Sequence, residues 1–325
     1  RAIRFPTSPS PSWPTSLRPQ HLTVLFSSRT QVCPVPALTP VAWNLVIIAG
    51  LAAIYVQGDY TYFGATDASL GASEGPSGVF CVACERCAAT VADCLASVAA
   101  QSYAHREHVV IDGASTDGTV AVLEAHRDRL AVLVSEPDRG IYDALNKGIA
   151  RATGEVVGFL HADDVYAGPE VLAHVAAAFT DPAVAAVYGD LQYVRQDNPN
   201  QVVRHWRSAP FSPRRLAWGW MPPHPTLYVR REWYARIGGF DTRYRIAADY
   251  DCILRLFSRP GFAAVYLPEV LVRMRLGGAS NRSLANIVRK SREDLDALRR
   301  AGVGALGGWG ALAWKNLSKL GQFRG

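Results

Sequence analysis

The sequence predicts an α/β fold in which a mostly parallel sheet is flanked by helices. Three observations support this prediction. Short apolar segments alternate with segments of helical spacing from about Val79 onward, and several of the apolar segments end in an acid and a turn. Hydrophobic residues make up 49% of the 325-residue chain and charged residues 19%. This composition is typical of a globular protein with a substantial core.

Strand-like and helical segments follow one another in order. Asp117, for example, supplies N-cap chemistry directly before an apolar stretch of helical period. Strands that alternate with helices pair in parallel and are covered on both faces, and ligands bind beyond their carboxyl ends. The predicted order is strand 79–83, helix 90–101, strand 107–115, helix 117–130, strand 131–138, helix 140–152, strand 155–164, helix 168–179 and strand 183–194.

The positive charge of the chain is concentrated near its end. The net charge is +6, yet residues 271–325 alone carry 11 Lys or Arg against 3 Asp or Glu. Two interpretations stay open for this basic segment: a solvated helical face, and a surface for an acidic partner such as an anionic membrane. A nucleic acid is not among the expected partners.

Six cysteines allow a metal site as an alternative. A C-x-x-C-x-x-C pattern favours zinc or an iron–sulfur cluster, but the fourth cysteine follows at an unusual spacing and no second half-site completes the set. Nothing indicates a disulfide framework, so we expect reduced thiols and a cytoplasmic location. The cysteines are Cys33, Cys81, Cys84, Cys87, Cys94 and Cys252.

Residues 1–78 differ from the rest of the chain. They open with a Pro/Ser-rich stretch that forms no regular element, and the run 41–56 is apolar for 16 residues. A buried helix, a signal-like segment and a membrane span all remain open for that run, which is shorter than the roughly 20 residues a span needs. The chain begins with Arg rather than Met, which leaves its native start open.

Acids stand where two predicted strands end. Asp112 closes one strand, and because Ser115 and the residues after it supply the turn and cap, we expect its carboxylate to be free for a ligand. Asp163 and Asp164 close another strand, where two adjacent carboxylates repel each other. Mg²⁺ or Mn²⁺ would relieve this repulsion, since hard cations take carboxylate oxygens. The alternative is an ordinary helix cap.

Two helix starts carry further candidates. Asp138 and Gly140 precede the helix that holds Asn146 and Lys147, and a lysine with helix N–H groups suits a phosphate. An exposed face of an amphipathic helix is the alternative. The segment "AADYDCILRLF" also opens with acids, which favour the helix dipole or, near a metal-bound diphosphate, act as a general base.

These segments together resemble a known family. "VVIDGASTDGT", "SEPDRGIYDALNKGIARATGEVVGFLHADD", "MPPHPTLYVRRE" and "IGGFDTRYRIAADYDCILRL" are similar to the inverting nucleotide-sugar glycosyltransferases of family two, which have the GT-A fold. The bacterial members that build exopolysaccharide or lipopolysaccharide are the most similar. The resemblance covers 79–281. It implies a GT-A domain there, preceded by an atypical region 1–78 and followed by basic amphipathic helices in 282–325.

The resemblance implies a donor side. Asp112, with Ser115, matches the acid that contacts the nucleobase. The segment Asp138 to Gly140 and the pair Asn146–Lys147 match residues that line the nucleotide.

The resemblance also implies a reaction centre with Mn²⁺ or Mg²⁺. Asp163 points toward the ribose and Asp164 toward the metal. Asp249 matches the base that deprotonates the acceptor hydroxyl. His224 matches a histidine on the acceptor side, and Arg275 a basic residue of a loop that closes over the diphosphate.

The sequence departs from the family pattern at two places. Glu85 and Arg86 stand where members have an aromatic residue and Asn, and His161 takes the first position of the DxD-type triplet. After the family segment, the pattern of residues 282–300 predicts a helix with a charged face, and aromatic and basic residues follow it. That ending suits a lipid interface or a helix packed on the domain.

The implied activity is sugar transfer, with inversion, from a nucleoside-diphosphate-sugar to a saccharide or lipid-linked acceptor in cell-surface polysaccharide biosynthesis. Two alternatives remain: a metal-dependent nucleotidyltransferase, and a degenerate, non-catalytic protein that binds nucleotide-sugars. The expected location is the cytoplasm, including the inner face of the plasma membrane.

Overall fold

The computed structural model describes residues 78–84, 87–276, 284–304 and 308–318. Several sequence predictions lie outside this described part: those for 1–77 with its apolar run 41–56, for Glu85 and Arg86, and for the last residues of the basic segment. The division of the chain at residues 78 and 281 stays a prediction.

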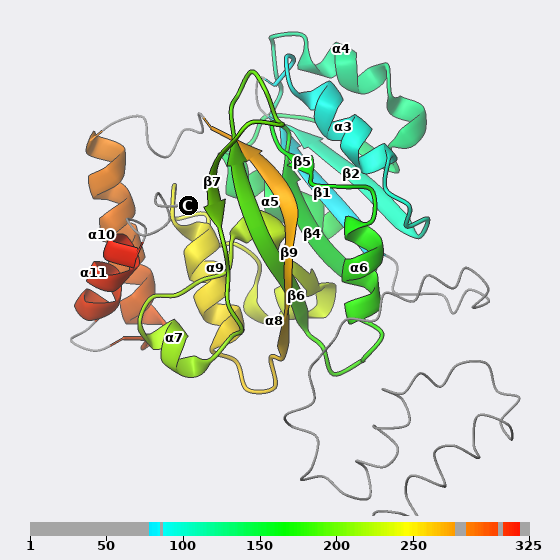
Figure 1. Ribbon diagram of the computed structural model, residues 1–325. Helices are drawn as coiled ribbons and strands as arrows, with labels where there is room; N and C mark the ends of the chain where they lie inside the picture. The colour runs from blue at the N-terminus through cyan, green and yellow to red at the C-terminus, as the bar shows by residue number, and fades with distance from the viewer. Residues whose placement is uncertain (1–77, 85–86, 277–283, 305–307, 319–325) are drawn as a thin grey trace, which may run out of the picture. The chain divides into compact units, whose positions relative to one another are not determined.

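A nine-stranded sheet forms the centre of the described part, in the order β3-β2-β1-β4-β8-β6-β9-β5, with β7 paired to β6 (Figure 1). The first four strands in this order are parallel to one another. Strand β8 runs antiparallel between β4 and β6, after which β6 and β9 are again parallel. Six of the nine strands thus share one direction, which confirms the prediction of a mostly parallel sheet. The strands are β1 (Gly78–Cys84), β2 (Arg106–Asp112), β3 (Val132–Ser135), β4 (Val156–His161), β5 (Val165–Tyr166), β6 (Ala186–Val194), β7 (Val202–Trp206), β8 (Tyr228–Arg230) and β9 (Ala264–Arg275).

Helices cover both faces of this sheet. Successive residues of β2 show the division, because Val109 and Ile111 pack in one hydrophobic cluster and Val110 in the other. Helices α3 (Val91–Ala99), α4 (Thr119–Glu124) and α6 (Val171–Ala178) pack on the Val110 side. The other side is covered by α5 (Ile141–Arg151), α7 (Pro213–Ala217), α8 (Arg231–Ile237), α9 (Ala248–Phe257), α10 (Leu284–Arg300) and α11 (Trp309–Ser318).

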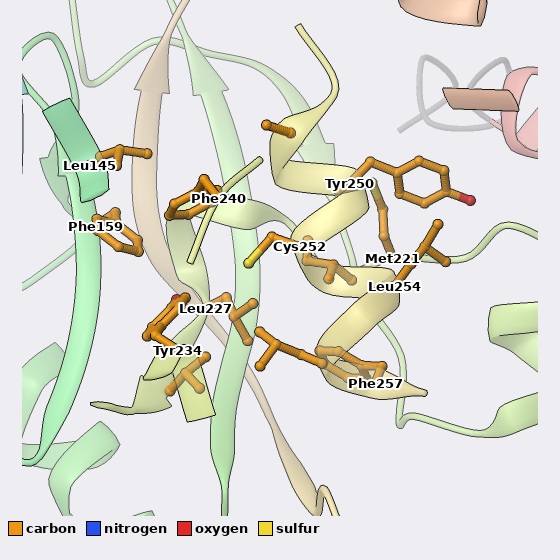
Figure 2. Packing of buried hydrophobic residues seen from close by; sticks show 14 of the residues in the cluster. Leu145, Phe159, Met221, Leu227, Tyr234, Phe240, Tyr250, Cys252, Leu254 and Phe257 are labelled. Atoms are coloured by element: carbon orange, nitrogen blue, oxygen red, sulfur yellow. The ribbon is translucent and has the colours of Figure 1, made fainter. Parts of the chain in front are cut away.

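An aromatic cluster joins β4 to α8 and to the loop that leads into α9 (Figure 2). The ring of Phe159 from β4 lies 5.4 Å from that of Phe240 and 5.8 Å from that of Tyr234, measured between centroids and with edge-to-face geometry. Such pairs add to the free energy gained by burial. The cluster fixes the loop around Phe240 against β4.

The predicted alternation of strands and helices holds through β6, with two differences. The predicted strand 155–164 ends at His161, and the short strand β5 follows it before α6. The predicted helix 117–130 ends at Glu124, and a short 3₁₀ turn covers Arg127–Arg129. Helices α10 and α11 form the predicted C-terminal helical extension. No helix in the described part is long and apolar enough to cross a membrane.

Candidate functional site

The predicted acids gather at one edge of the sheet. Strand β2 ends at Asp112 and strand β4 ends at His161. Strand β1 lies between them and pairs in parallel with both, so these two ends lie at the same edge of the sheet. Asp163 and Asp164 follow β4 directly. Strand β9 runs parallel to β6 and ends at Arg275 beside this acidic pair.

Asp164 is a buried carboxylate with an unpaired oxygen. The residue is 1% exposed, Oδ1 accepts the backbone N–H of Arg275 at 3.2 Å, and Oδ2 has no hydrogen-bond partner among the described residues. Burial raises the pKa of Asp164 well above its ordinary value, and Asp163 raises it further. Leaving a buried anion without partners costs free energy. A cation at Oδ2 would remove that cost, so this carboxylate fits a divalent metal.

The described residues contain no preassembled group of three or more His, Cys, Asp or Glu side chains that could hold a metal. A metal at Asp164 would therefore take its remaining oxygen ligands from Asp163, water or substrate. Mg²⁺ commonly binds in this way, through one or two carboxylates and phosphate oxygens. The metal role of Asp164 stays a prediction.

Arg275 places a positive charge next to the acidic pair. It is 4% exposed, and its guanidinium donates to the carbonyl oxygen of Asp163 at 3.2 Å and forms an ion pair with Asp93 of α3. The expectation that Arg275 belongs to a loop is wrong, because β9 continues through it in pairing with Val194. Its contact with a diphosphate stays a prediction.

The two acids that open α9 differ in their partners. Asp251 is 4% exposed and pairs with Arg255 one turn later, at 2.7 Å. Asp249 is half-buried. Its Oδ1 accepts the backbone N–H of Tyr250 at 2.8 Å and a longer contact of 3.4 Å from the hydroxyl of Tyr142, while no described residue binds Oδ2. Asp251 therefore stabilises α9 through its ion pair, whereas Asp249 keeps one carboxylate oxygen available to accept a proton.

Two neutral histidines adjoin these acids. The rings of His161 and His224 lie 6.0 Å apart between centroids, and His224 stacks on Phe159. Burial lowers the pKa of His224 to about 4 and also lowers the pKa of His161. Within the described part, Nδ1 of His161 and Nε2 of His224 have no hydrogen-bond partner. Both rings therefore carry a buried nitrogen whose hydrogen-bonding capacity is unused among the described residues.

Acids from the end of β4 and the start of α9 act on the same two side chains, His161 and Tyr193. Burial lowers the pKa of His161, and Asp163 and Asp249 both oppose this effect. Burial raises the pKa of Tyr193 on β6, and Asp164 and Asp249 both add to the rise. Because such effects weaken with distance, acids from the end of β4 and the start of α9 act on one shared region.

Glu293 of α10 caps the start of α9. Its carboxylate accepts the backbone N–H groups of Arg245 at 3.2 Å, Ile246 at 2.8 Å and Ala247 at 3.0 Å. Helix α9 has no N-cap side chain of its own. A carboxylate at this position satisfies free N–H groups and is favoured by the helix dipole. Glu293 thus fixes the segment that leads into Asp249.

Asp112 is saturated by internal hydrogen bonds. It is fully buried, and it accepts the backbone N–H and hydroxyl of Ser115 and, at 2.6 Å, the hydroxyl of Ser135. The expectation that the turn leaves this carboxylate free is wrong, because Ser115 folds back onto it. The donor-side roles of Asp112 and Ser115 stay predictions.

The turn before α5 is held by Asp138. Its Oδ1 accepts the backbone N–H of Gly140 at 2.8 Å, and Gly140 has φ = 112°, a region that favours glycine. The ammonium group of Lys147 lies 3.0 Å from the carboxylate of Glu136. A phosphate would compete with this surface ion pair. The nucleotide contacts of Asp138, Gly140 and Lys147 stay predictions.

Asn146 joins α5 to the loop before α9. Its amide donates to the carbonyl oxygen of Phe240 and accepts the N–H of the same residue, both at 2.9 Å. Gly239 has φ = 70°, and a Cβ there would lie 2.5 Å from Oδ1 of Asn146. The amide is therefore used inside the protein, and its predicted contact with the nucleotide would require it to leave Phe240.

Three residues of this region were not anticipated from the sequence: Glu293, Tyr193 and Asp93. Each reaches the site from an element distant in the chain, and no local pattern distinguishes it from an ordinary surface or strand residue. Tyr142 carried a partial signal, since it follows the turn at Gly140 in the first turn of α5.

The family model of glycosyl transferase family 2 matches residues 79–257, more than half of the chain. The chain belongs to glycosyl transferase family 2. This membership confirms the resemblance predicted from the motifs. The family 2 segment includes Asp112, Asp164 and Asp249, and it ends before Arg275 and Glu293.

Several curated relatives share this family 2 segment. An uncharacterized glycosyltransferase of Mycobacterium tuberculosis is 40% identical over 162 residues, which cover 49% of this chain and 60% of that protein. A PGL/p-HBAD biosynthesis glycosyltransferase of Mycobacterium bovis is 34% identical over 60% of this chain and 75% of its own length. The O-antigen biosynthesis protein RfbC of Myxococcus xanthus is 35% identical over 66% of this chain and 16% of its own length. The chain spans about three fifths of the first relative.

Solved structures show the same fold. A mannosyltransferase of Pyrobaculum calidifontis, in complex with GDP-Man and Mn²⁺, aligns with a TM-score of 0.54 and 23% identity over 75% of this chain and 70% of that one. Residues 1–349 of TarS from S. aureus align with a TM-score of 0.56 and 18% identity over 74% and 70%. These likenesses confirm the predicted GT-A fold for this family 2 protein.

Proposed function

We propose that this protein is a metal-dependent, inverting glycosyltransferase of cell-surface polysaccharide biosynthesis. It transfers a sugar from a nucleoside-diphosphate-sugar to a saccharide or lipid-linked acceptor. The observation that carries the proposal is that Asp164 has a buried oxygen without a hydrogen-bond partner in the described part, and that Asp164 and Asp249 both raise the pKa of Tyr193. Support comes from relatives named for PGL/p-HBAD and O-antigen biosynthesis, and from structural neighbours in complex with GDP-Man or UDP-GlcNAc.

The donor lies along the carboxyl ends of β2 and β4 in this proposal. Asp112 and Ser115 form the base of the nucleotide site, and Asp163 faces the ribose. Asp164, with Asp163 beside it, would hold Mn²⁺ or Mg²⁺, which when bound stabilises the negative charge that develops on the departing diphosphate. Burial and Asp163 raise the pKa of Asp164, so its ionised form needs a compensating positive charge.

Asp249 acts as the general base. Its free oxygen accepts the proton of the acceptor hydroxyl while the hydroxyl oxygen bonds to the anomeric carbon. The bond from this carbon to the diphosphate breaks on the opposite side, its electron pair stays with the diphosphate, and the anomeric configuration inverts. General-base assistance contributes about 100- to 10,000-fold in rate. His224, neutral at pH 7, lies on the acceptor side of the site.

A screen of nucleotide-sugars with and without Mn²⁺ tests the proposal. We expect release of nucleoside diphosphate with one donor, dependent on Mn²⁺, lost in Asp249→Asn and retained in the surface control Asp197→Asn. Release of pyrophosphate from a nucleoside triphosphate would instead indicate a nucleotidyltransferase. Donor binding by the unmodified protein without release, for every acceptor offered, would indicate a non-catalytic binding protein.

A cytoplasmic location belongs to the same proposal. It is supported by Cys94 and Cys252, two buried cysteines that form no disulfide within the described part of the chain. Fractionation of cells that express the tagged full chain tests it, and recovery in the extracytoplasmic fraction would contradict it.

A further inference from the structure

Helix α11 packs Ala311 and Leu312 into the core, yet it exposes two tryptophans and buries its lysine. Its Lys315 is 5% exposed, whereas Trp309 and Trp314 are 56% and 54% exposed. Ala313 is exposed between them, and Ala311 on the opposite side is buried. Surface helices of globular proteins normally bury their apolar stripe and present charge to solvent. The outward side of α11 therefore needs a partner outside this domain.

The inward position of Lys315 fixes this orientation. Its ammonium group lies 3.0 Å from the carboxylate of Asp294, which is 1% exposed, and 3.2 Å from the centroid of the Tyr250 ring. A second cation, Lys290, also pairs with Asp294 at 3.0 Å. Rotating α11 to bury its tryptophans would break the ion pair between Lys315 and Asp294. Asp294 would then keep one of its two cationic partners, and losing a partner is costly for a buried charge.

The apolar surface extends beyond α11. Trp218, at the end of α7, is 51% exposed and packs edge-to-face on Trp314, with centroids 6.1 Å apart. We name Trp218, Trp309 and Trp314 the tryptophan patch. Scattered exposed apolar residues are normal on a protein surface, but three half-exposed tryptophans on adjoining elements mark an interaction site.

Arginines adjoin the tryptophan patch. The guanidinium of Arg299 lies 5.9 Å from the ring centroid of Trp309. The acid in this part of α10, Asp296, is paired with Arg300 at 2.9 Å. The exposed arginines of the adjoining helices are Arg214 and Arg215 on α7 and Arg289, Arg292, Arg299 and Arg300 on α10. The surface is thus aromatic and basic together.

We propose that the tryptophan patch docks on an anionic lipid surface. Tryptophan favours the headgroup level of a bilayer, and arginine binds lipid phosphates through its planar fork of N–H donors. The exposed arginines of α7 and α10 complement such a surface. A second copy of the chain fits less well, because it would bring the arginines of two patches together. This inference does not depend on glycosyl transfer.

Vesicle binding tests the proposal with the full chain. We compare vesicles of phosphatidylcholine with vesicles that also contain phosphatidylglycerol, for the unmodified protein and Trp309→Ser/Trp314→Ser. The partition coefficient on anionic vesicles should fall about tenfold in the double variant, since binding scales with buried apolar area, and should weaken in high salt. Val202→Ser/Val203→Ser removes exposed apolar area from β7 and should bind as the unmodified protein does.

Quenching by brominated lipids locates the contact directly, even where another segment also holds the chain on the vesicle. Tryptophan fluorescence of the unmodified protein should be quenched, and most of that quenching should be absent in the double variant at equal vesicle-bound protein. Equal quenching in both proteins would overturn the proposal. So would concentration-dependent association without vesicles that the double variant abolishes, since it would assign the tryptophan patch to a second copy.

Discussion

Glu293 accepts the backbone N–H of Ala247 at 3.0 Å, and Ala247 immediately precedes helix α9. This contact links α10 to the helix that carries Asp249, although the family 2 match ends at residue 257. Because Glu293 also accepts from Ile246, one carboxylate holds the whole entry into α9. The position of the proposed base therefore depends on an element outside the family segment.

Substituting Glu293→Gln should lower turnover and leave donor affinity nearly unchanged. The amide has one accepting oxygen where the carboxylate has two, so the segment before Asp249 loses part of its cap. Misplacement of a catalytic group by a fraction of an ångström costs roughly ten- to a hundredfold in rate. Steady-state kinetics and calorimetric donor binding separate the two quantities. Arg292→Gln, exposed on the same helix, is the control, and an equal loss in both variants would show a general effect of α10.

Asp249→Asn and Asp251→Asn should fail in different ways. Asp249→Asn removes the base, so kcat should fall by about 100- to 10,000-fold with an unchanged thermal midpoint. Asp251→Asn breaks a buried ion pair and leaves Arg255 without its carboxylate, which costs on the order of 3 kcal/mol of stability. Thermal unfolding and turnover are measured on both. Full turnover by Asp249→Asn would refute its assignment as the base.

Asp164 should make the stability of the protein depend on metal. Because the pKa of Asp164 is raised, its ionised form destabilises the metal-free fold. This destabilisation becomes smaller as the pH falls and the carboxylate takes up a proton. Mn²⁺ should therefore raise the thermal midpoint of the unmodified protein at pH 7.5, whereas Asp164→Asn should start higher and respond little. Thermal shift assays with a Mn²⁺ titration measure this, with Asp197→Asn as the matched control. Equal responses in all three proteins would contradict the ligand role.

His108 should contribute to acid unfolding independently of the site. Burial, with help from Arg106, lowers the pKa of His108 from 6.5 to about 4. A histidine with a depressed folded-state pKa stabilises the fold fully above its unfolded value, and this stability is lost as the pH falls from about 6.5 towards 4. The loss at pH 5 is on the order of 2 kcal/mol. Urea unfolding at pH 7.5 and 5.0 should show a smaller change for His108→Leu, while exposed His105→Gln serves as control.

The sequence predicted those parts of the site that depend on local chemistry. Asp163 and Asp164 stand out because two acids close an apolar strand, and Asp249 and Asp251 because they open an amphipathic helix. The choice of Asp249 as the base came from the family resemblance and stays a prediction. Arg275 was placed in a loop, since nothing local shows that its strand pairs with β6 far earlier in the chain. Asp112 was expected to be free, because the fold-back of Ser115 and the approach of Ser135 from β3 are tertiary features. Glu293 was not predicted, because a carboxylate that caps a helix from another element leaves no characteristic spacing in the sequence.

Strand β9 has a practical consequence for anyone who shortens this protein. It lies inside the sheet between β6 and β5, so a fragment that stops at residue 257 would expose the hydrogen-bonding edge of β6 along most of its length. Bare edges of this kind invite pairing with neighbouring molecules and precipitation. Such a trimmed fragment would also lack Arg275 and Glu293, and inactivity in it would reveal nothing about Asp164 or Asp249.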